Sequence, residues 1–464
     1  MSSNLLYVLY IMFFSGSIIL SEYKTLFFVL ISITNIVALL TRSQNRNTVI
    51  FSATIMGSET FSIINIIMAI IIGQIRKPLE ICSKIKKRTL LLMIWFSAVS
   101  LLSGVYYSTV FNSIFYFSYL ILLWITYKYI RVDMDCYEIK SILKKFLLLQ
   151  AIITVEIVIK YHSFIPGDIF GGTIMNAHFF SNWLILTCFV YIYVLKKMRR
   201  ISIIDIGYLI STIIMLILAS ANAVVIAAVL AIMIYSVLKY KRLSDKNDLF
   251  WMICFTYLFF AIFLRVLQVP QIKNIIQNKS TYLNLYLYSK GWNYKFQYFY
   301  GTLFDSLKGI RLFTGYGLGQ YGSRVANAFA YDVMWRASNG INNFIASVFP
   351  SSYVPQFARY ISFYTEDFVN SILWRSAVMS YPFSSFMALL AETGVIGVIL
   401  VARWLNGKFK HMECKIIIYY FLIVCIFDIF FDDYQCVLPL IFFLSMLNRK
   451  NNKVNRETKQ KNTL

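Results

Sequence analysis

The sequence predicts an all-α membrane protein that crosses the bilayer many times. Of its residues, 59% are hydrophobic and only 14% are charged, and the mean hydropathy is +0.66. A soluble core of this size cannot bury so much apolar surface, whereas a bilayer solvates it. The apolar residues fall into runs of roughly 20, the length of a membrane-spanning helix. We therefore expect about 12 or 13 transmembrane helices and one large helical external loop.

Four regions follow from the distribution of these runs. We expect an N-terminal transmembrane bundle over 1–269, a large external loop over 270–382, C-terminal transmembrane helices over 383–447 and a basic cytoplasmic tail over 448–464. A pore or carrier can keep its connections short, so this long insert indicates chemistry or recognition on one face of the membrane. The expected spans are 4–20, 24–41, 49–73, 89–107, 109–130, 146–163, 177–195, 202–220, 222–238, 249–269, 383–402, 416–431 and 434–447.

Basic clusters between the runs predict the orientation of the chain. Clusters such as Lys196–Arg200 and Lys239–Lys246 lie in short loops, as is typical of cytoplasmic loops. With these clusters inside, the loop 270–382 lies outside. Counting back also places the N-terminus outside, unless span 49–73 is broken near Gly57-Ser58-Glu59, which would place it in the cytoplasm. The net charge of +23 is explained by these loops, so nucleic acid is not an expected partner.

The external loop is basic and rich in aromatic residues. It carries ten lysines and arginines against four aspartates and glutamates, and it contains no cysteine. Its aromatic side chains can pack a small domain or helices that lie on the membrane. Alternatively some of them, such as Trp292 and Tyr316, stack on sugar rings, which offer apolar C–H faces. No CxxC motif or Cys/His cluster in the sequence suggests a metal site.

Ionisable residues within the apolar runs are candidates for function, because a charge inside a bilayer is costly. Glu156 and Lys160 are four apart on one helix and are expected to pair. Glu392 lies in the span that follows the loop, close to Gly394 and Gly397, whose spacing favours close helix approach. The alternative is that Glu392 only packs helices together. The other members of this group are Glu59, Arg265 and Asp428.

Three glycines alternate within the loop, in the segment Phe313–Tyr321. Gly315, Gly317 and Gly319 allow the backbone to turn and to approach another group closely. The pattern does not predict a dinucleotide site, because no strand–turn–helix unit surrounds it.

Four short motifs occur in a fixed order along the second part of the chain. They are Gly172–Ala177, Leu218–Ala223, Gly315–Gly319 and Leu390–Gly397. Together with the long loop, this order resembles the O-antigen polymerase and O-antigen ligase superfamily of bacterial membrane glycosyltransferases. The resemblance runs from about Gly171 to the end of the chain.

The chain departs from that family's pattern at several positions. Ala221 stands where the family often has an arginine, and Lys295 is the nearest match to an arginine that precedes the glycines. Ligases carry a His-Asn pair where this chain has Phe383-Ser384, and no histidine occurs in 270–382. Loss of the ligase-like histidine favours a polymerase over a ligase.

The resemblance implies polymerisation of oligosaccharide repeat units into O-antigen or a similar surface polysaccharide, at the periplasmic face of the bacterial inner membrane. The donor would be a growing chain on undecaprenyl diphosphate, and the acceptor one repeat unit on the same lipid. The acceptor hydroxyl attacks the donor's anomeric carbon, and lipid diphosphate leaves. The resemblance implies no cofactor and no metal. Chain length is expected to depend on a partner protein, a chain-length regulator.

The expected site combines cations for the diphosphate with a base for the acceptor hydroxyl. Positive side chains stabilise charge on the leaving group, and arginine can bind phosphate oxygens with two hydrogen bonds. The base is expected to be Glu392, Glu366 or Asp367. The expected catalytic residues are Glu392, Arg265 and Arg324. The expected residues for binding the diphosphate or the glycan are Lys295, Arg311, Gly315, Gly317, Gly319, Trp292 and Tyr316.

Three other functions stay open. A flippase or transporter of lipid-linked oligosaccharide would share the spans and the buried charges, but it would not need a long external loop. An O-antigen ligase would share the motifs. A membrane-bound acyltransferase would need a histidine on the reaction side. His162 and His178 lie near the outer face, but far from the loop in sequence.

Overall fold

The computed structural model describes residues 1–42, 45–76, 87–106, 110–130, 134–167, 169–199, 201–240, 301–323, 384–409, 414–427, 431 and 433–447. Every regular element among these residues is helical, as the sequence predicts. Up to residue 240 they are α1 (Ser3–Ile19), η1 (Ser21–Tyr23), α2 (Lys24–Thr41), α3 (Arg46–Ala53), α4 (Glu59–Arg76), α5 (Lys87–Tyr106), α6 (Val110–Tyr129), α7 (Cys136–Tyr161), η3 (Gly172–Ile174), α8 (Ala177–Met198), α9 (Ile203–Ala219) and α10 (Asn222–Tyr240). Later elements are α15 (Arg311–Thr314), α21 (Ser385–Phe409), α22 (Ile416–Phe427) and α23 (Tyr434–Met446).

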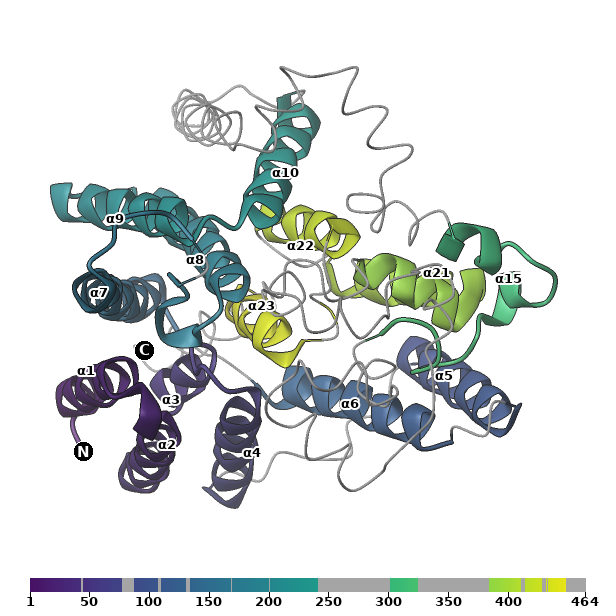
Figure 1. Cartoon of the computed structure of the whole chain (residues 1–464), viewed down its shortest axis with the longest axis horizontal. Helices are drawn as coiled ribbons and strands as arrows, with labels where there is room; N and C mark the ends of the chain where they lie inside the picture. The colour runs from purple at the N-terminus through teal and green to yellow at the C-terminus, as the bar shows by residue number, and fades with distance from the viewer. Residues whose placement is uncertain are drawn as a thin grey trace, which may run out of the picture.

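Sequence neighbours pack against each other, and the C-terminal helices pack among the N-terminal ones. Contacts join α1 to α2, α5 to α6 and α8 to α9. α23 contacts α3, α4, α6 and α8, and it lies near the centre of the view in Figure 1. α21 packs against α5, with α15 on its far side (Figure 1). The C-terminal helices therefore complete the bundle that the first half of the chain begins.

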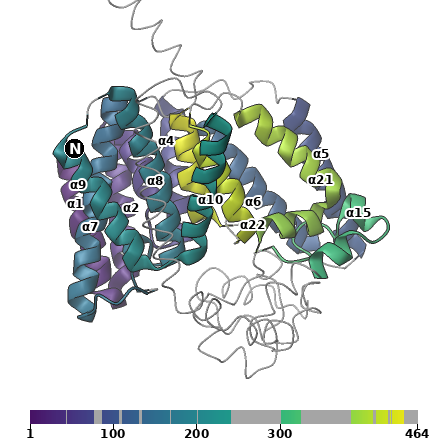
Figure 2. The same cartoon turned by 90° about the horizontal axis from the view of Figure 1, so that it is seen from above.

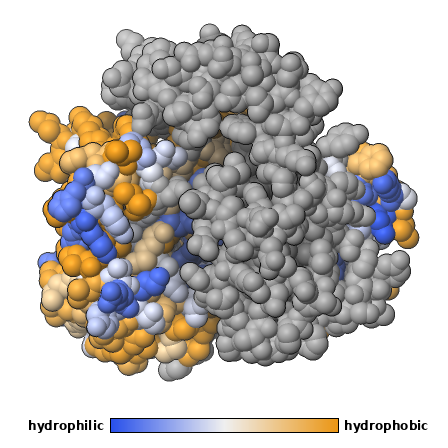
Figure 3. Space-filling view, viewed as in Figure 1, coloured by the Kyte–Doolittle hydropathy of each residue, from blue (hydrophilic) through white to orange (hydrophobic). Residues whose placement is uncertain are grey.

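Three helical segments are long and apolar enough to cross a membrane, by length and composition. They are Ser21–Thr41, Ala177–Met198 and Ser385–Asn406, and shorter apolar helices accompany them. Apolar side chains also face outward: Ile203 of α9 is 88% exposed, and Figure 3 shows hydrophobic surface on the described helices. The total of about 12 or 13 crossings stays a prediction. The expected span 249–269 lies outside the described residues.

The expected span 49–73 is two elements, with a break near Gly57-Ser58-Glu59, which is the alternative that the sequence left open. α3 ends at Ala53 and α4 begins at Glu59, which leaves the segment 54–58 outside any helix. The backbone of this segment is held by side chains from elsewhere: Thr173 Oγ1 donates to Ile55 O (2.7 Å), and Gln435 Nε2 donates to Met56 O (2.6 Å). Buried carbonyls that leave a helix need such donors. We call segment 54–58 with its donors the neutral break.

The chain reverses its direction at this break. The side chain of Arg46, at the start of α3, lies beside Gly73, near the end of α4. The two elements therefore run antiparallel, and the chain returns to the end where α3 began. Asn45 Nδ2 also donates to Met1 O (3.2 Å) at that end. The N-terminus thus lies at the same end of the helices as Arg46 and the end of α4, and the side of the membrane on which this end lies stays a prediction.

The expected ion pair between Glu156 and Lys160 is absent from the described contacts. Lys160 Nζ instead donates to Ile18 O (2.7 Å) and Ser21 Oγ (3.2 Å), where it caps the C-terminal end of α1. Glu156 Oε2 is buried without a hydrogen-bond partner among the described residues. The i, i+4 spacing predicted the pair, but the orphan carbonyls at the end of α1 attract the ammonium group instead.

Candidate functional site

A kink in α21 sets the geometry of the candidate site. Gly394, inside this helix, has φ 66° and ψ −178°, which no ordinary helical residue adopts. A Cβ atom at this position would overlap the Phe313 carbonyl oxygen. Figure 2 shows α21 bent, with α15 beside its bent part. Gly394 therefore allows the loop backbone to enter the space that a straight helix would fill.

The carbonyl groups that precede the kink accept hydrogen bonds from outside the helix. Ala391 O accepts from Tyr316 N (2.7 Å), and Glu392 O accepts from Gly317 N (2.9 Å). Thr393 O accepts from the indole Nε1 of Trp95 on α5 (3.3 Å). A break in a helix exposes carbonyls to other donors. The segment that holds the glycines supplies two of these donors, so the kink and the loop stabilise each other.

The alternating glycines make the close approach that the sequence predicts. Gly315, Gly317 and Gly319 all have positive φ, at 68°, 99° and 74°. A Cβ atom at Gly315 would lie 2.5 Å from the carbonyl carbon of Glu392, and one at Gly319 would lie 2.8 Å from Asn112 O. Only glycine combines these φ values with such contacts.

The carboxylate of Glu392 binds a ring of backbone N–H groups. The side chain is buried, at 1% exposure. Its Oε2 accepts from Gly319 N (2.8 Å), and its Oε1 accepts from Tyr321 N (3.1 Å), Gly322 N (3.1 Å) and Ser323 N (3.0 Å). Hydrogen bonds to an ionised acceptor are stronger than neutral ones, and successive N–H groups form a natural anion site. We call Glu392 with these four N–H groups the Glu392 cradle.

Helix α6 supports the cradle from the other side, through residues that the sequence reasoning missed. Asn112 Nδ2 donates to Gly319 O (3.1 Å), and Ser113 Oγ donates to Leu318 O (3.1 Å). Gln320 Nε2 in turn donates to Ser113 Oγ (3.3 Å). The sequence signal that could have identified them is the pair of successive polar residues, Asn112 and Ser113, near the start of an apolar run.

Arg311 is positioned beside the cradle by one aromatic residue, Tyr316. Its Nη1 donates to the Tyr316 hydroxyl (2.7 Å), and its guanidinium carbon lies 4.4 Å from the centre of the Tyr316 ring. The Tyr316 and Tyr321 rings are 5.1 Å apart, and the Tyr321 hydroxyl donates to Asp305 Oδ2 (3.4 Å). Arg311 keeps partial exposure, so it can meet a ligand at this edge.

Some expected binding residues have a different role in the structure. Tyr316 is 1% exposed and its ring is covered by Arg311, so it orients the guanidinium and offers no face to a sugar. The N–H group of Gly315 bonds to Arg311 O, and those of Gly317 and Gly319 bond to Glu392. Because their N–H groups already bind protein acceptors, these glycines shape the loop and do not donate to a ligand.

Several expected site residues lie outside the described residues. They are Arg265, Trp292, Lys295, Arg324, Glu366 and Asp367. Arg324 follows directly after Ser323, the last residue of the cradle. Of the predicted residues that the structure describes, Glu392, Arg311, Tyr316 and the three glycines lie together.

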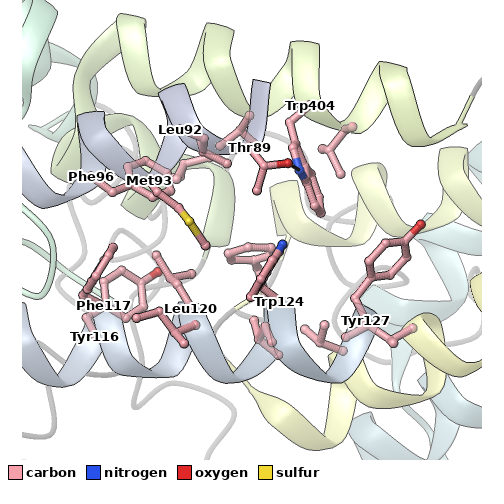
Figure 4. Close-up of a pocket in the computed structure, with 18 of the residues that line it drawn as sticks. Thr89, Leu92, Met93, Phe96, Tyr116, Phe117, Leu120, Trp124, Tyr127 and Trp404 are labelled. Atoms are coloured by element: carbon pink, nitrogen blue, oxygen red, sulfur yellow. Dashed lines mark hydrogen bonds between the residues drawn. The ribbon is translucent and has the colours of Figure 1, made fainter. Parts of the chain in front are cut away.

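An apolar cavity of about 140 Å³ adjoins the cradle. Side chains of α5 and α6 point toward one another across it, among them Phe96, Leu120 and Trp124 (Figure 4). Its lining includes Leu318, within the glycine segment, and Leu389, one turn before Glu392 on α21. The cavity offers an apolar group a place beside the charged site.

Among the described residues, no three His, Cys, Asp or Glu side chains come together as metal ligands.

Comparisons with known proteins gave no relatives for this geometry. A scan against protein-family models, a search of curated proteins and a search of solved structures each found no match.

Proposed function

We propose that this chain is a membrane glycosyltransferase that polymerises oligosaccharide repeat units carried on undecaprenyl diphosphate. The reaction takes place at the periplasmic face of the bacterial inner membrane. The enzyme needs no metal and no cofactor.

One observation carries the proposal. The two motifs that most resemble the polymerase and ligase superfamily, Gly315–Gly319 and Leu390–Gly397, bind each other through the Glu392 cradle. They are far apart in sequence, so their meeting is a property of the fold. The cradle also places an arginine, Arg311, at the edge of the site, as a diphosphate substrate requires.

The proposed reaction joins two lipid-linked glycans. A hydroxyl oxygen of the acceptor forms a bond to the anomeric carbon of the donor sugar. The bond from that carbon to the diphosphate oxygen breaks, and the lipid diphosphate leaves with the electron pair. Arg311, with Arg324, stabilises the negative charge on this leaving group. The hydroxyl proton passes to a base, for which Glu366 and Asp367 are the proposed groups.

Glu392 is assigned a positioning role in this proposal. Both of its carboxylate oxygens accept backbone N–H groups, and the residue is buried. Its oxygens are therefore occupied by the hydrogen bonds that hold the loop. We therefore propose that Glu392 fixes the loop on which Arg311 and Arg324 are carried. The apolar cavity beside Leu318 suits part of a polyprenyl chain.

The test compares two neighbouring cations in a strain that lacks the gene. The strain is complemented with wild type, Arg311→Ala or Lys308→Ala, and its surface polysaccharide is separated on gels. Wild type and Lys308→Ala should restore a long-chain ladder, because the described contacts of the Lys308 side chain are with Phe304 and Asp305 and not with Glu392 or its four N–H donors. Arg311→Ala should leave lipid A-core capped with a single repeat unit.

Other outcomes identify other functions. A deletion strain that shows no repeat unit at its surface would indicate a flippase. Polymer that accumulates on the carrier lipid without transfer to lipid A-core would indicate a ligase. A full ladder in the deletion strain, or in the Arg311→Ala strain, would overturn the proposal.

A further inference from the structure

Residues 301–313 are amphipathic, but their apolar side chains face outward, which is the opposite of the usual arrangement in a soluble protein. Large apolar side chains point outward: Leu303 (45% exposed), Phe304 (51%), Leu307 (58%), Ile310 (76%) and Phe313 (51%). We call these five residues the outer patch. Three polar side chains of the same segment, Thr302, Asp305 and Ser306, are at most 1% exposed, whereas the basic Lys308 and Arg311 are not buried. In water this segment would expose a large apolar surface. Such a surface indicates that the segment contacts a membrane or another protein.

The segment lies at the side of the helices, level with the bent part of α21. The Phe313 carbonyl contacts Gly394, which is nine residues beyond the start of α21 at Ser385. Nine residues of helix correspond to about 13 Å. Figures 1 and 2 both show α15 at the edge of the bundle, beside α21. When α21 crosses a bilayer with Ser385 at the membrane surface, Phe313 of the outer patch lies at the depth of the acyl chains or the headgroup boundary.

The apolar surface continues onto the neighbouring helices. Leu101 and Leu102 near the end of α5 are 58% and 73% exposed, and Phe386 at the start of α21 is 42% exposed. α21 contacts both α5 and α15. Figure 3 shows hydrophobic and hydrophilic surface side by side at the place of α15. A single lipid-facing belt accounts for all of these side chains.

Two cations border the outer patch, which favours lipid over a protein as its partner. Lys308 Nζ lies 3.9 Å from the centre of the Phe304 ring, and Arg311 follows Ile310 directly. Basic side chains beside buried apolar groups reach anionic headgroups while their stems stay in the apolar layer. The charge and the apolar surface therefore fit the same partner, a phospholipid leaflet.

We propose that the outer patch inserts into the outer leaflet of the membrane and anchors this part of the loop there. Its partner is the acyl region of phospholipids, with Lys308 and Arg311 at the headgroups. The insertion holds Arg311 at the level where lipid-linked phosphates lie. The insertion itself is inferred from exposure and from the contact of Phe313 with α21, whereas the place of Arg311 beside lipid-linked phosphates rests on the proposed function.

The test measures the environment of single positions in the full-length chain. Ile310→Cys and Leu307→Cys are compared with Lys308→Cys after nitroxide labelling and reconstitution in phosphatidylcholine–phosphatidylglycerol vesicles. The unsubstituted chain, labelled in the same way, gives the background of its own cysteines. Power saturation with oxygen and with a water-soluble nickel chelate then reports the surroundings of each label.

At positions 307 and 310 we expect greater contact with oxygen than with the nickel chelate, and the reverse at position 308. All three side chains are more than half exposed, so the labels leave the interior packing unchanged. Equal access of the nickel chelate at all three positions would overturn the proposal. Protection of positions 307 and 310 from both reagents would also overturn it, since it would indicate a protein partner or a second copy of the chain.

Discussion

At residues 54–58 neutral side chains from three other elements close a gap between two helices, whereas at Gly394 a carboxylate and a distant loop close the gap together. In the neutral break, Thr173, Gln435 and Trp183 supply uncharged donors, and Thr54 and Ile55 are at most 2% exposed. In the Glu392 cradle, the acceptor is a charged group and its donors belong to the backbone.

Only one of the two breaks is suited to chemistry. Both supply hydrogen-bond donors to backbone carbonyls that have no partner within a helix. Residues 54–56 of the neutral break are buried, and segment 54–58 carries no charged side chain that a ligand could meet. The cradle places Arg311 at an exposed edge beside an apolar cavity. We therefore expect the first break to affect stability alone, and the second to affect stability and activity together.

Gly394→Ala should have the largest effect, because it removes the kink. The new side chain would overlap the Phe313 carbonyl and would force an alanine to φ 66°. We expect a loss of about 2–5 kcal/mol in the free energy of unfolding. The melting temperature of the purified chain in detergent measures it. Gly207→Ala in α9 is the control, since nothing lies within 4 Å of its Cβ position. Equal melting temperatures would show that the kink is dispensable.

Glu392→Gln should come next. The amide keeps one acceptor oxygen, but its NH₂ group then faces an N–H donor of the cradle. We expect a loss of about 2–4 kcal/mol and of the polysaccharide ladder. Glu156→Gln is the matched control, because Glu156 Oε2 has no hydrogen-bond partner among the described residues. A Glu392→Gln chain that melts like the control would contradict the cradle as the anchor of the loop.

Thr173→Val tests the neutral break with a smaller change. It removes the bonds from Gln150 Nε2 (2.7 Å) and to Ile55 O (2.7 Å) and keeps the side-chain volume. We expect a loss of about 1–3 kcal/mol in thermal unfolding. The ladder, corrected for the amount of folded protein, should not change. A shorter ladder at equal protein level would mean that this break also serves the reaction.

Tyr316→Phe should have the smallest effect on stability. It removes the hydroxyl that accepts from Arg311 and keeps the ring beneath the guanidinium. We expect a loss of about 0.5–1.5 kcal/mol. The polysaccharide ladder should nevertheless become shorter, because Arg311 loses one of its two positioning contacts. An unchanged ladder would show that the ring alone orients the arginine.

The sequence predicted the helical class because the length and the apolar composition of a run are local properties. It also indicated the possible break at Gly57-Ser58-Glu59 and the importance of Glu392 and the alternating glycines. It did not predict that Glu392 binds Gly319, since no local pattern encodes contacts between residues 73 positions apart. For the same reason it paired Glu156 with its near neighbour Lys160, which reaches α1 instead.

The two halves of the cradle leave the ribosome at different times. Gly319 precedes Glu392 by 73 residues, so at ribosomal rates its amide emerges roughly 4–15 s earlier. During that interval the glycine segment has no carboxylate to fold around, and α21 has not yet been made. The cradle therefore closes late, after the helices before it have been translated. A nascent chain that stops before Glu392 would contain α6, whose Asn112 and Ser113 can bind the glycine segment, but it would lack the carboxylate that binds the four N–H groups.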